Sequence, residues 1–286
     1  MLGPRWCCLP KGEKARRGRT ARLSGTDVGR QEALKYAIIS DPHANLEALK
    51  AVLKLVDDSD ADRTVCLGDV VGYNANPNEC VELMRERDIP TICGNHDAVA
   101  CGITEPWGFN PIALAAALWT REALTDDNIE WLRLLPDGRR FGPEEHGHFL
   151  AAHGSPLDRD TYMFGWEDVI PHIDYVREQN CDLCLFGHTH CPGIFTDDGV
   201  YTVDDDSRFV VGEDAAEGAR AKVFFINPGS VGQPRDGDAR ASFGLMDTQS
   251  GVFELVRVDY SIKDAAERVI EAGLPHFLAD RLYLGR

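Results

Sequence analysis

The sequence predicts an α/β domain built in layers, in which a parallel β-sheet continues into an antiparallel part. The first observation is an alternation over residues 35–190, where short apolar runs are followed by segments with apolar residues at helical spacing. The second is a change after residue 220, where strand-like segments follow one another with turns between them. The chain has 286 residues, 43% of them hydrophobic, so it can bury a substantial core.

The alternating part begins with an apolar run at residues 35–40, which is typical of a buried parallel strand. In the next segment Leu46, Leu49 and Val56 lie at helical spacing, and Asn45 is a suitable N-cap. Further elements are predicted in this order: a strand at 64–69, a helix at 78–88, a strand end at 90–97, a helical stretch at 110–135, a strand at 148–155, a helix at 166–179 and a strand at 182–190.

The C-terminal third resembles a meander, with strands predicted at residues 222–230, 242–248 and 252–259. Two helices that begin near Ser261 and His276 close the chain. Residues 1–33 are rich in Arg and Gly and lack periodicity, so we expect a disordered basic extension ahead of a folded domain over residues 34–286. Within that domain we expect a helical insertion at about 98–140 and an acidic loop or hairpin at about 196–220.

The charge of the chain limits its partners. The net charge is −17, and the first 35 residues contribute nine Lys/Arg and three Asp/Glu, so the remainder carries −23. Such an acidic body repels a phosphate backbone, and we expect no stable nucleic-acid binding. No apolar run approaches the roughly 18–20 residues that cross a bilayer, so no membrane association is expected.

The chain contains nine cysteines. An odd number without a secretory signal indicates free thiols in a reducing compartment, and we expect a cytoplasmic protein. Cys181 and Cys184 form a CxxC sequence that could be redox-active or half of a zinc site. Since strand-like apolar residues surround them, we interpret both as small core residues.

Polar side chains follow each predicted strand of the alternating part. These residues are Asp41 and His43, Asp69, Asn95 with His96 and Asp97, His153, and finally His188 and His190. Because the carboxyl ends of strands in an open α/β sheet face one crevice, we expect these side chains to meet. His148 is an alternative to His153, but it lies inside the predicted strand. Any one of these residues alone could be a cap, a turn former or a structural histidine; their joint occurrence indicates a site.

Carboxylates, imidazoles and an amide without a required thiolate are ligands for divalent cations such as manganese, iron or zinc. The set exceeds what one ion needs. Two ions about 3.5–4 Å apart, bridged by one carboxylate, fit the number of ligands, and such pairs serve phosphoester hydrolysis.

The ordered motifs DPH (41–43), GDVVG (68–72), GNHD (94–97), AHGS (152–155) and GHTH (187–190) resemble those of the calcineurin-like metallophosphoesterase superfamily. The resemblance covers residues 35–237 at least and implies a four-layer αββα sandwich, with two mixed β-sheets flanked by helices. GDVVGY and NPGSVGQPRDG are most similar to the compact bacterial phosphodiesterase-like branch. Ala44 departs from that pattern, since glycine is common after the first histidine.

The resemblance also implies roles for single residues. Asp41, His43 and His190 would bind one metal ion, and Asn95, His153 and His188 the other, with Asp69 bridging both. His96 would act on the substrate phosphate as a catalytic residue, and Asp97 would orient or charge the His96 imidazole. The implied cofactors are two divalent ions, Mn²⁺ first, with Fe, Zn or Ni as alternatives. The implied reaction is hydrolysis of a phosphomonoester or phosphodiester by a metal-bridging hydroxide.

Arg235 is the candidate for clamping a phosphate oxygen, and the alternative is an ordinary turn arginine paired with Asp236 or Asp238. The expected partner is a small phosphorylated substrate or a phosphoprotein. Alternative functions are a non-catalytic binding scaffold with this fold, an activity of the protein Ser/Thr phosphatase type, and a nuclease. The oligomeric state is not predicted.

Overall fold

We describe a computed structural model of the chain, limited to residues 34–142, 147–201, 208–211 and 222–286. The basic extension predicted for residues 1–33 lies outside these ranges, as does most of the predicted acidic loop. The described part of that loop includes a hairpin of β6 (Gly193–Thr196) and β7 (Gly199–Tyr201), in which Thr196 pairs with Gly199.

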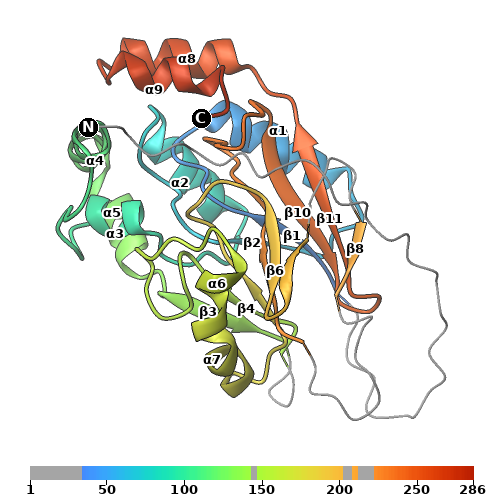
Figure 1. Cartoon of the computed structure of the whole chain (residues 1–286). Coiled ribbons are helices and arrows are strands. Elements are labelled where there is room, and N and C mark those ends of the chain that lie inside the picture. Colours follow the sequence, from blue (N-terminus) through green and yellow to red (C-terminus); the bar gives the residue numbers. More distant parts are fainter. Residues whose placement is uncertain (1–33, 143–146, 202–207, 212–221) are drawn as a thin grey trace. The chain divides into compact units, whose positions relative to one another are not determined.

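The first sheet combines parallel and antiparallel strands. β1 (Lys35–Ile39) pairs in parallel with β2 (Arg63–Cys66) and antiparallel with β10 (Ala241–Asp247). β11 (Val252–Val258) and β8 (Arg208–Val210) extend the antiparallel part, which gives the order β2–β1–β10–β11–β8 (Figure 1). Thus the last two strands of the predicted C-terminal meander join the sheet that the first strands begin, whereas its first strand, β9 (Phe224–Asn227), lies in the second sheet.

The second sheet is also mixed. β4 (Phe149–Ala152), β5 (Leu183–Leu185) and β9 (Phe224–Asn227) are parallel neighbours. β3 (Gly138–Phe141) pairs antiparallel with β4 at one edge, and β6 and β7 complete the order β3–β4–β5–β9–β6–β7.

Burial along β1 shows how the layers form. Tyr36 and Ile38 enter an apolar core shared with residues of the second sheet such as Phe149 and Leu185. Ala37 and Ile39 point to the opposite face, where they join a core with α1 (Leu46–Asp57) and α2 (Pro77–Glu86). This alternation follows from the two-residue period of a strand.

The outer face of the second sheet is covered by short helices (Figure 1). These are α6 (Trp166–Val169), the 3₁₀ segment η1 (Ile170–His172) and α7 (Ile173–Glu178). Helices, sheet, sheet and helices therefore form the four-layer αββα sandwich, as predicted. The CxxC cysteines belong to this outer core, as predicted, and burial raises the pKa of both thiols.

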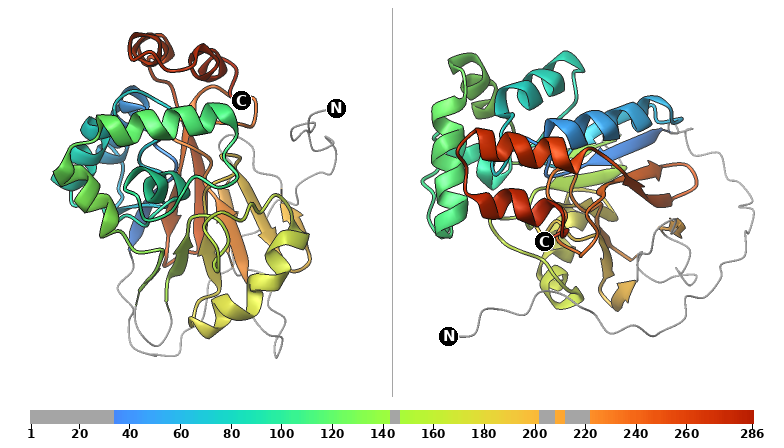
Figure 2. Two further views of the ribbon diagram at one scale, coloured as in Figure 1. Left: turned by 90° about the vertical axis from the view of Figure 1, so that its left-hand side faces the viewer. Right: turned by 90° about the horizontal axis from the view of Figure 1, so that it is seen from above.

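Additional helices lie beside the sandwich. The predicted helical stretch consists of α4 (Pro111–Ala123) and α5 (Asp126–Arg133), preceded by the short α3 (Asn95–Ala100). The C-terminal α8 (Ile262–Glu271) and α9 (His276–Leu282) form a hairpin. Its apolar side packs on Ala113 and Ala116 of α4 and on Tyr73, and Figure 2 shows it beside α4.

Two predicted elements differ in the structure. The third strand end, at residues 90–97, is reduced to one bridge between Thr91 and Cys66, since residues from Asn95 onward turn into α3. The helix predicted over 166–179 is interrupted at Pro171, which lacks the N–H that a continuous helix needs. Among the described residues, no helix has both the length and the apolar character that a membrane crossing requires.

Candidate metal centre

The predicted site residues meet where the parallel strands of both sheets end. Asp41 follows β1, Asp69 follows β2 and His153 follows β4, while His188 and His190 follow β5. Asn95 is the first residue of α3. Segments more than 140 residues apart are thereby joined, because His188 donates its backbone N–H to the Asp41 carboxylate at 3.2 Å.

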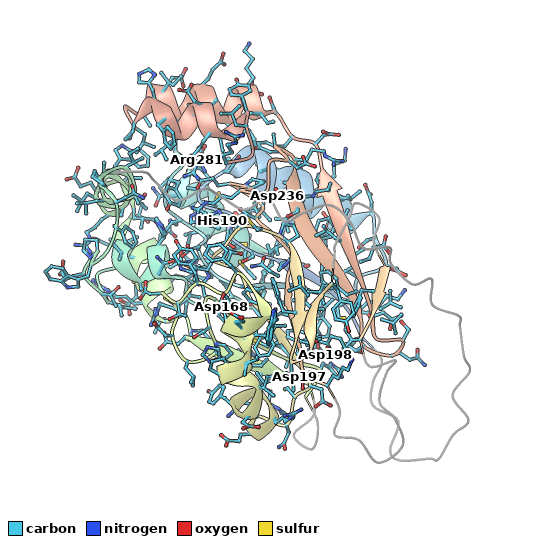
Figure 3. All side chains as sticks on the ribbon, viewed as in Figure 1. Asp168, His190, Asp197, Asp198, Asp236 and Arg281 are labelled. Carbon is cyan, nitrogen blue, oxygen red and sulfur yellow. The ribbon has the colours of Figure 1, made fainter. Side chains whose placement is uncertain are left out.

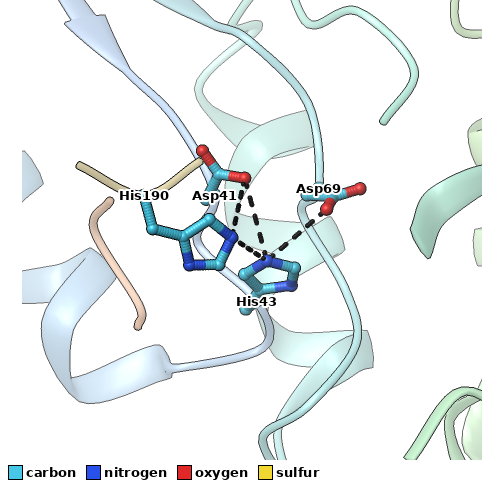
Figure 4. Close-up of side chains that lie close together, drawn as sticks. All are labelled: Asp41, His43, Asp69 and His190. Carbon is cyan, nitrogen blue, oxygen red and sulfur yellow. Dashed lines mark hydrogen bonds and ion pairs between the residues drawn. The ribbon is translucent and has the colours of Figure 1, made fainter. Parts of the chain in front are cut away.

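The first cluster consists of Asp41, His43, Asp69 and His190, all buried (Figure 4). His43 Nε2 lies 3.0 Å from His190 Nε2 and 3.5 Å from Asp69 Oδ2. His190 Nε2 lies 3.2 Å from Asp41 Oδ1. Two imidazole nitrogens and two carboxylates therefore converge on one small volume.

The second cluster consists of Asp69, His153 and His188, also buried. His153 Nε2 lies 3.2 Å from Asp69 Oδ2 and 3.2 Å from the side-chain oxygen of Asn95. Asn95 thus joins this group, and Asp69 belongs to both clusters. The alternative His148 lies elsewhere, with Nδ1 3.4 Å from the Tyr36 hydroxyl.

The hydrogen bonds of the imidazoles test whether the clusters suit a cation. Nδ1 of His43 faces the carbonyl oxygen of Val71 at 2.9 Å, and Nδ1 of His190 faces that of Gln233 at 2.6 Å. Because a carbonyl only accepts, Nδ1 carries the proton in each neutral ring and Nε2 keeps its lone pair. Two lone pairs facing each other at 3.0 Å repel unless a cation lies between them.

The second cluster also directs acceptors toward a common volume. His153 Nδ1 donates to the Leu67 carbonyl at 2.8 Å, which leaves Nε2 directed at the Asp69 and Asn95 oxygens. Without an ion Nε2 carries a proton, and a bound cation would replace that proton. Asp69 Oδ2 is buried and has no hydrogen-bond partner among the described residues. Carboxylate and imidazole acceptors directed at one another fit bound divalent cations.

Burial and neighbouring charges set the proton affinities. Burial lowers the pKa of His43 and of His190 well below the ordinary value, and lowers that of His188 to about 3. Burial acts in the same sense on His153, but the Asp69 carboxylate outweighs it and raises that pKa to about 9. Three of the four imidazoles are therefore neutral at pH 7, which is the form that binds metal ions.

The loops that carry the site adopt unusual backbone conformations. Asp41, His43, Asp69, His188 and His190 all have φ between 46° and 65°. This left-handed region costs an L-residue about 1–2 kcal/mol, and such strain is concentrated at functional sites. Gly94 is required for a different reason, since a Cβ there would lie 2.1 Å from the Asp69 carboxylate.

His96 lies beside the clusters without joining either group. Its backbone N–H donates to Asp69 Oδ1 at 2.8 Å, and its ring packs 4.3 Å from Tyr73 and 4.7 Å from Phe109, measured between centroids. Burial lowers its pKa to about 4, with Asp69 opposing. Nδ1 is buried and has no hydrogen-bond partner in the described part of the chain.

The Asp97 carboxylate binds backbone groups, so an effect of Asp97 on the His96 imidazole stays a prediction. Its carboxylate accepts the backbone N–H groups of Val71 and Gly94, each at 3.1 Å, rather than a proton of the His96 ring. Asp97 thus ties the loop after β2 to the start of α3. Burial raises the pKa of Asp97, and the charge of Asp69 adds to this effect.

Arg235 approaches the site from the loop after β9. Its backbone N–H donates to the carbonyl of His190 at 3.2 Å, and Nη2 donates to the Gln233 side chain at 2.9 Å. The alternative, a turn arginine paired with Asp236 or Asp238, is not found, since Asp236 pairs with Arg257 and Asp238 with Arg240.

Sequence reasoning missed Tyr162, whose ring stacks on His188 with centroids 3.9 Å apart. It lies in the loop between β4 and α6 and belongs to none of the strand-end motifs. No pattern in the sequence singles it out.

The fold and the paired acceptor clusters define a metal-dependent phosphoesterase, a hydrolase that acts on phosphoester bonds. The family model of the calcineurin-like phosphoesterase superfamily domain matches residues 34–251. The chain belongs to this superfamily, as the strand-end motifs predicted.

Three relatives illustrate the similarity. An uncharacterized protein of Methanocaldococcus jannaschii is 37% identical over 87% of this chain and 98% of its own length. Phosphodiesterase YfcE of Escherichia coli is 26% identical over 75% of this chain and 88% of its own. The crystal structure of a metallophosphoesterase from Sphaerobacter thermophilus superimposes with a TM-score of 0.73 at 34% identity, covering 89% of this chain and all of that one. The similarity to YfcE agrees with the predicted compact bacterial branch.

Proposed function

We propose that this phosphoesterase uses two divalent ions to hydrolyse a phosphomonoester or phosphodiester. The observation that carries the proposal is the position of Asp69, whose carboxylate belongs to both acceptor clusters. One cluster would hold an ion through Asp41, His43 and His190, and the other through Asn95, His153 and His188. A bound pair would lower the pKa of water and neutralise charge on the phosphate.

Three further residues would contact the substrate phosphate or position the loops of the site. His96 is buried, neutral and adjacent to Asp69, so its ring N–H can donate a hydrogen bond to a phosphate oxygen. To protonate the leaving group it would first have to take up a proton, which the negative charge of a bound phosphate would favour. Arg235 would clamp a phosphate oxygen, since its guanidinium carries a buried Nε with no partner among the described atoms. Asp97 would position the loops that carry Asp69 and His96.

Mn²⁺ is the first candidate for both ions, with Fe, Zn or Ni as alternatives, because the donors are oxygen and imidazole nitrogen. A small phosphorylated compound or a phosphoprotein would be the substrate, and the cytoplasmic location stays a prediction. The non-catalytic scaffold is less well supported, since His96 and all seven ligand candidates are present in the two clusters and beside them.

The test compares the purified wild type with Asp69→Asn and with Asp127→Asn, a matched control at an exposed position of α5. Metal content is measured after loading with Mn²⁺, Fe²⁺, Zn²⁺ or Ni²⁺ in turn, and hydrolysis is followed with p-nitrophenyl phosphate and bis-p-nitrophenyl phosphate. We expect Asp69→Asn to bind less metal and to lose about 100-fold or more in kcat/KM. Replacing a residue that only hydrogen-bonds to a metal ligand already lowers activity by about 10–100-fold, and loss of a ligand should cost at least as much. Full activity of Asp69→Asn, or inert wild type with every metal, would contradict the proposal.

A further inference from the structure

We propose that Arg281, at the end of the C-terminal helix α9, and Arg235 together form an anion subsite beside the metal centre. The subsite would bind a second anionic group of the substrate. The preferred substrate class is then a small organic compound with two neighbouring phosphoryl groups, as in a diphosphate ester. This inference rests on the proposed phosphoesterase function and specifies its substrate.

Both guanidinium groups lie over one aromatic ring. The Arg235 and Arg281 Cζ atoms are 5.5 Å and 5.9 Å from the centroid of Tyr73. Tyr73 in turn lies 4.7 Å from the ring of His43 and 4.3 Å from that of His96. A single tyrosine therefore connects the two arginines to a metal-ligand candidate and to the candidate catalytic histidine. In Figure 3, Arg281 is labelled between the α8–α9 hairpin and His190.

In the described ranges, neither Arg235 nor Arg281 forms an ion pair with an Asp or Glu side chain. Arg235 donates to the neutral side-chain amide of Gln233. Arg281 donates from Nε to a main-chain carboxylate oxygen of Arg286, the last residue of the sequence, and its Nη groups have no acidic side chain as an ion-pair partner among the described residues. Neighbouring arginines behave differently, since Arg240 pairs with Asp238 and Arg268 with Glu47.

Two positive charges near each other repel. The two arginines lie close together although the net charge of −17 reflects an excess of carboxylates in the chain. Burial, followed by the charge of Arg235, lowers the pKa of Arg281 to about 10. Nε of Arg235 is buried and lacks a partner in the described structure. A bound anion would satisfy this donor and relieve the repulsion, since planar guanidinium groups match phosphate oxygens.

The fold holds Arg281 in place. Leu278 and Leu282 of α9 are buried in the apolar cluster that also contains Tyr73. Past the helix, the Gly285 carbonyl accepts the Gly237 N–H at 2.9 Å, which fixes the chain end to the loop that carries Arg235. The two arginines are thus positioned by rigid elements, as a preorganised binding site requires.

The test uses the Mn²⁺-loaded full chain as wild type, Arg281→Gln, Arg281→Lys and Arg268→Gln. Arg268→Gln is the matched control, because it removes the same charge from the same hairpin but from a pair with Glu47. Calorimetry measures the binding of methylenediphosphonate and of inorganic phosphate. Kinetics compare KM for p-nitrophenyl phosphate with KM for a nucleoside diphosphate, and thermal unfolding verifies that each variant is folded.

We expect the wild type and Arg268→Gln to bind methylenediphosphonate about tenfold or more tightly than phosphate, the effect of one charge-assisted contact. Arg281→Gln should lose this preference and raise KM for the diphosphate only, and Arg281→Lys should restore part of it. Equal effects of Arg281→Gln on both ligands, or no effect, would overturn the subsite while leaving the phosphoesterase proposal intact. A wild type that hydrolyses neither compound would instead reject the proposed function.

Discussion

At the scale of single residues, the site depends on which acceptors face each other. The Nδ1 protons of His43 and His190 are committed to the carbonyls of Val71 and Gln233, which directs two Nε2 lone pairs into one volume. Strand-end motifs predicted this convergence, but they could not show the carbonyls that set the tautomers. The motifs also could not show the hydrogen-bond partners of Asp97. Its neighbour in sequence is His96, but its carboxylate binds two backbone N–H groups.

A pair of variants separates the roles of His96 and Asp97. Asparagine has one acceptor oxygen, so Asp97→Asn should leave a buried N–H unpaired and lower the free energy of unfolding by about 1–3 kcal/mol. We expect kcat of the folded variant to change less than tenfold. His96→Gln should retain stability but lose about 10²–10⁴ in kcat. Urea unfolding and steady-state kinetics check both. A stable but inactive Asp97→Asn would favour the role predicted from the sequence.

At the scale of elements, the strand–helix alternation was predictable because burial on both faces produces continuous apolar runs. The structure of residues 90–97 was not predictable in this way, since an apolar run that ends in Gly94 fits either a strand or the segment that precedes a helix. The C-terminal hairpin was predicted as two helices, yet its contact with Tyr73 depends on how α8 and α9 pack.

The packing of α9 can be tested with two leucines. Leu278 is fully buried, so Leu278→Ala should reduce the free energy of unfolding by about 2–5 kcal/mol. Leu284, just past the helix, is 56% exposed, and Leu284→Ala should stay within about 0.5 kcal/mol of the wild type. Urea denaturation measures both variants. Similar small losses would show that the hairpin is not held by this apolar cluster.

At the scale of the whole molecule, the two sheets hold the ligand candidates at fixed positions before any ion binds. β1 and β2 of one sheet and β4 and β5 of the other end at the same place, so each sheet contributes to both acceptor clusters. Bound ions would therefore link the sheets as well as support chemistry, and stability should respond to metal.

Removal of metal should lower the melting temperature. Mn²⁺ at about 100 times its Kd contributes about 2.7 kcal/mol through preferential binding to the folded state. For a domain of this size this corresponds to a shift of roughly 5–10 °C. Differential scanning calorimetry of the chelator-treated and Mn²⁺-loaded protein measures the shift, and Asp69→Asn serves as the control with a reduced response. Identical melting curves would argue against ion binding at the two clusters.

By itself, the sequence determined the class of fold and the identity of the ligand candidates, because strand periodicity and the residues after each strand are local properties of the chain. Only the tertiary structure decided which acceptors share Asp69, where the Asp97 carboxylate binds, and that Arg281 reaches Tyr73 from the far end of the chain. These outcomes depend on the packing of segments that are distant in sequence. No local pattern of residues encodes such distances.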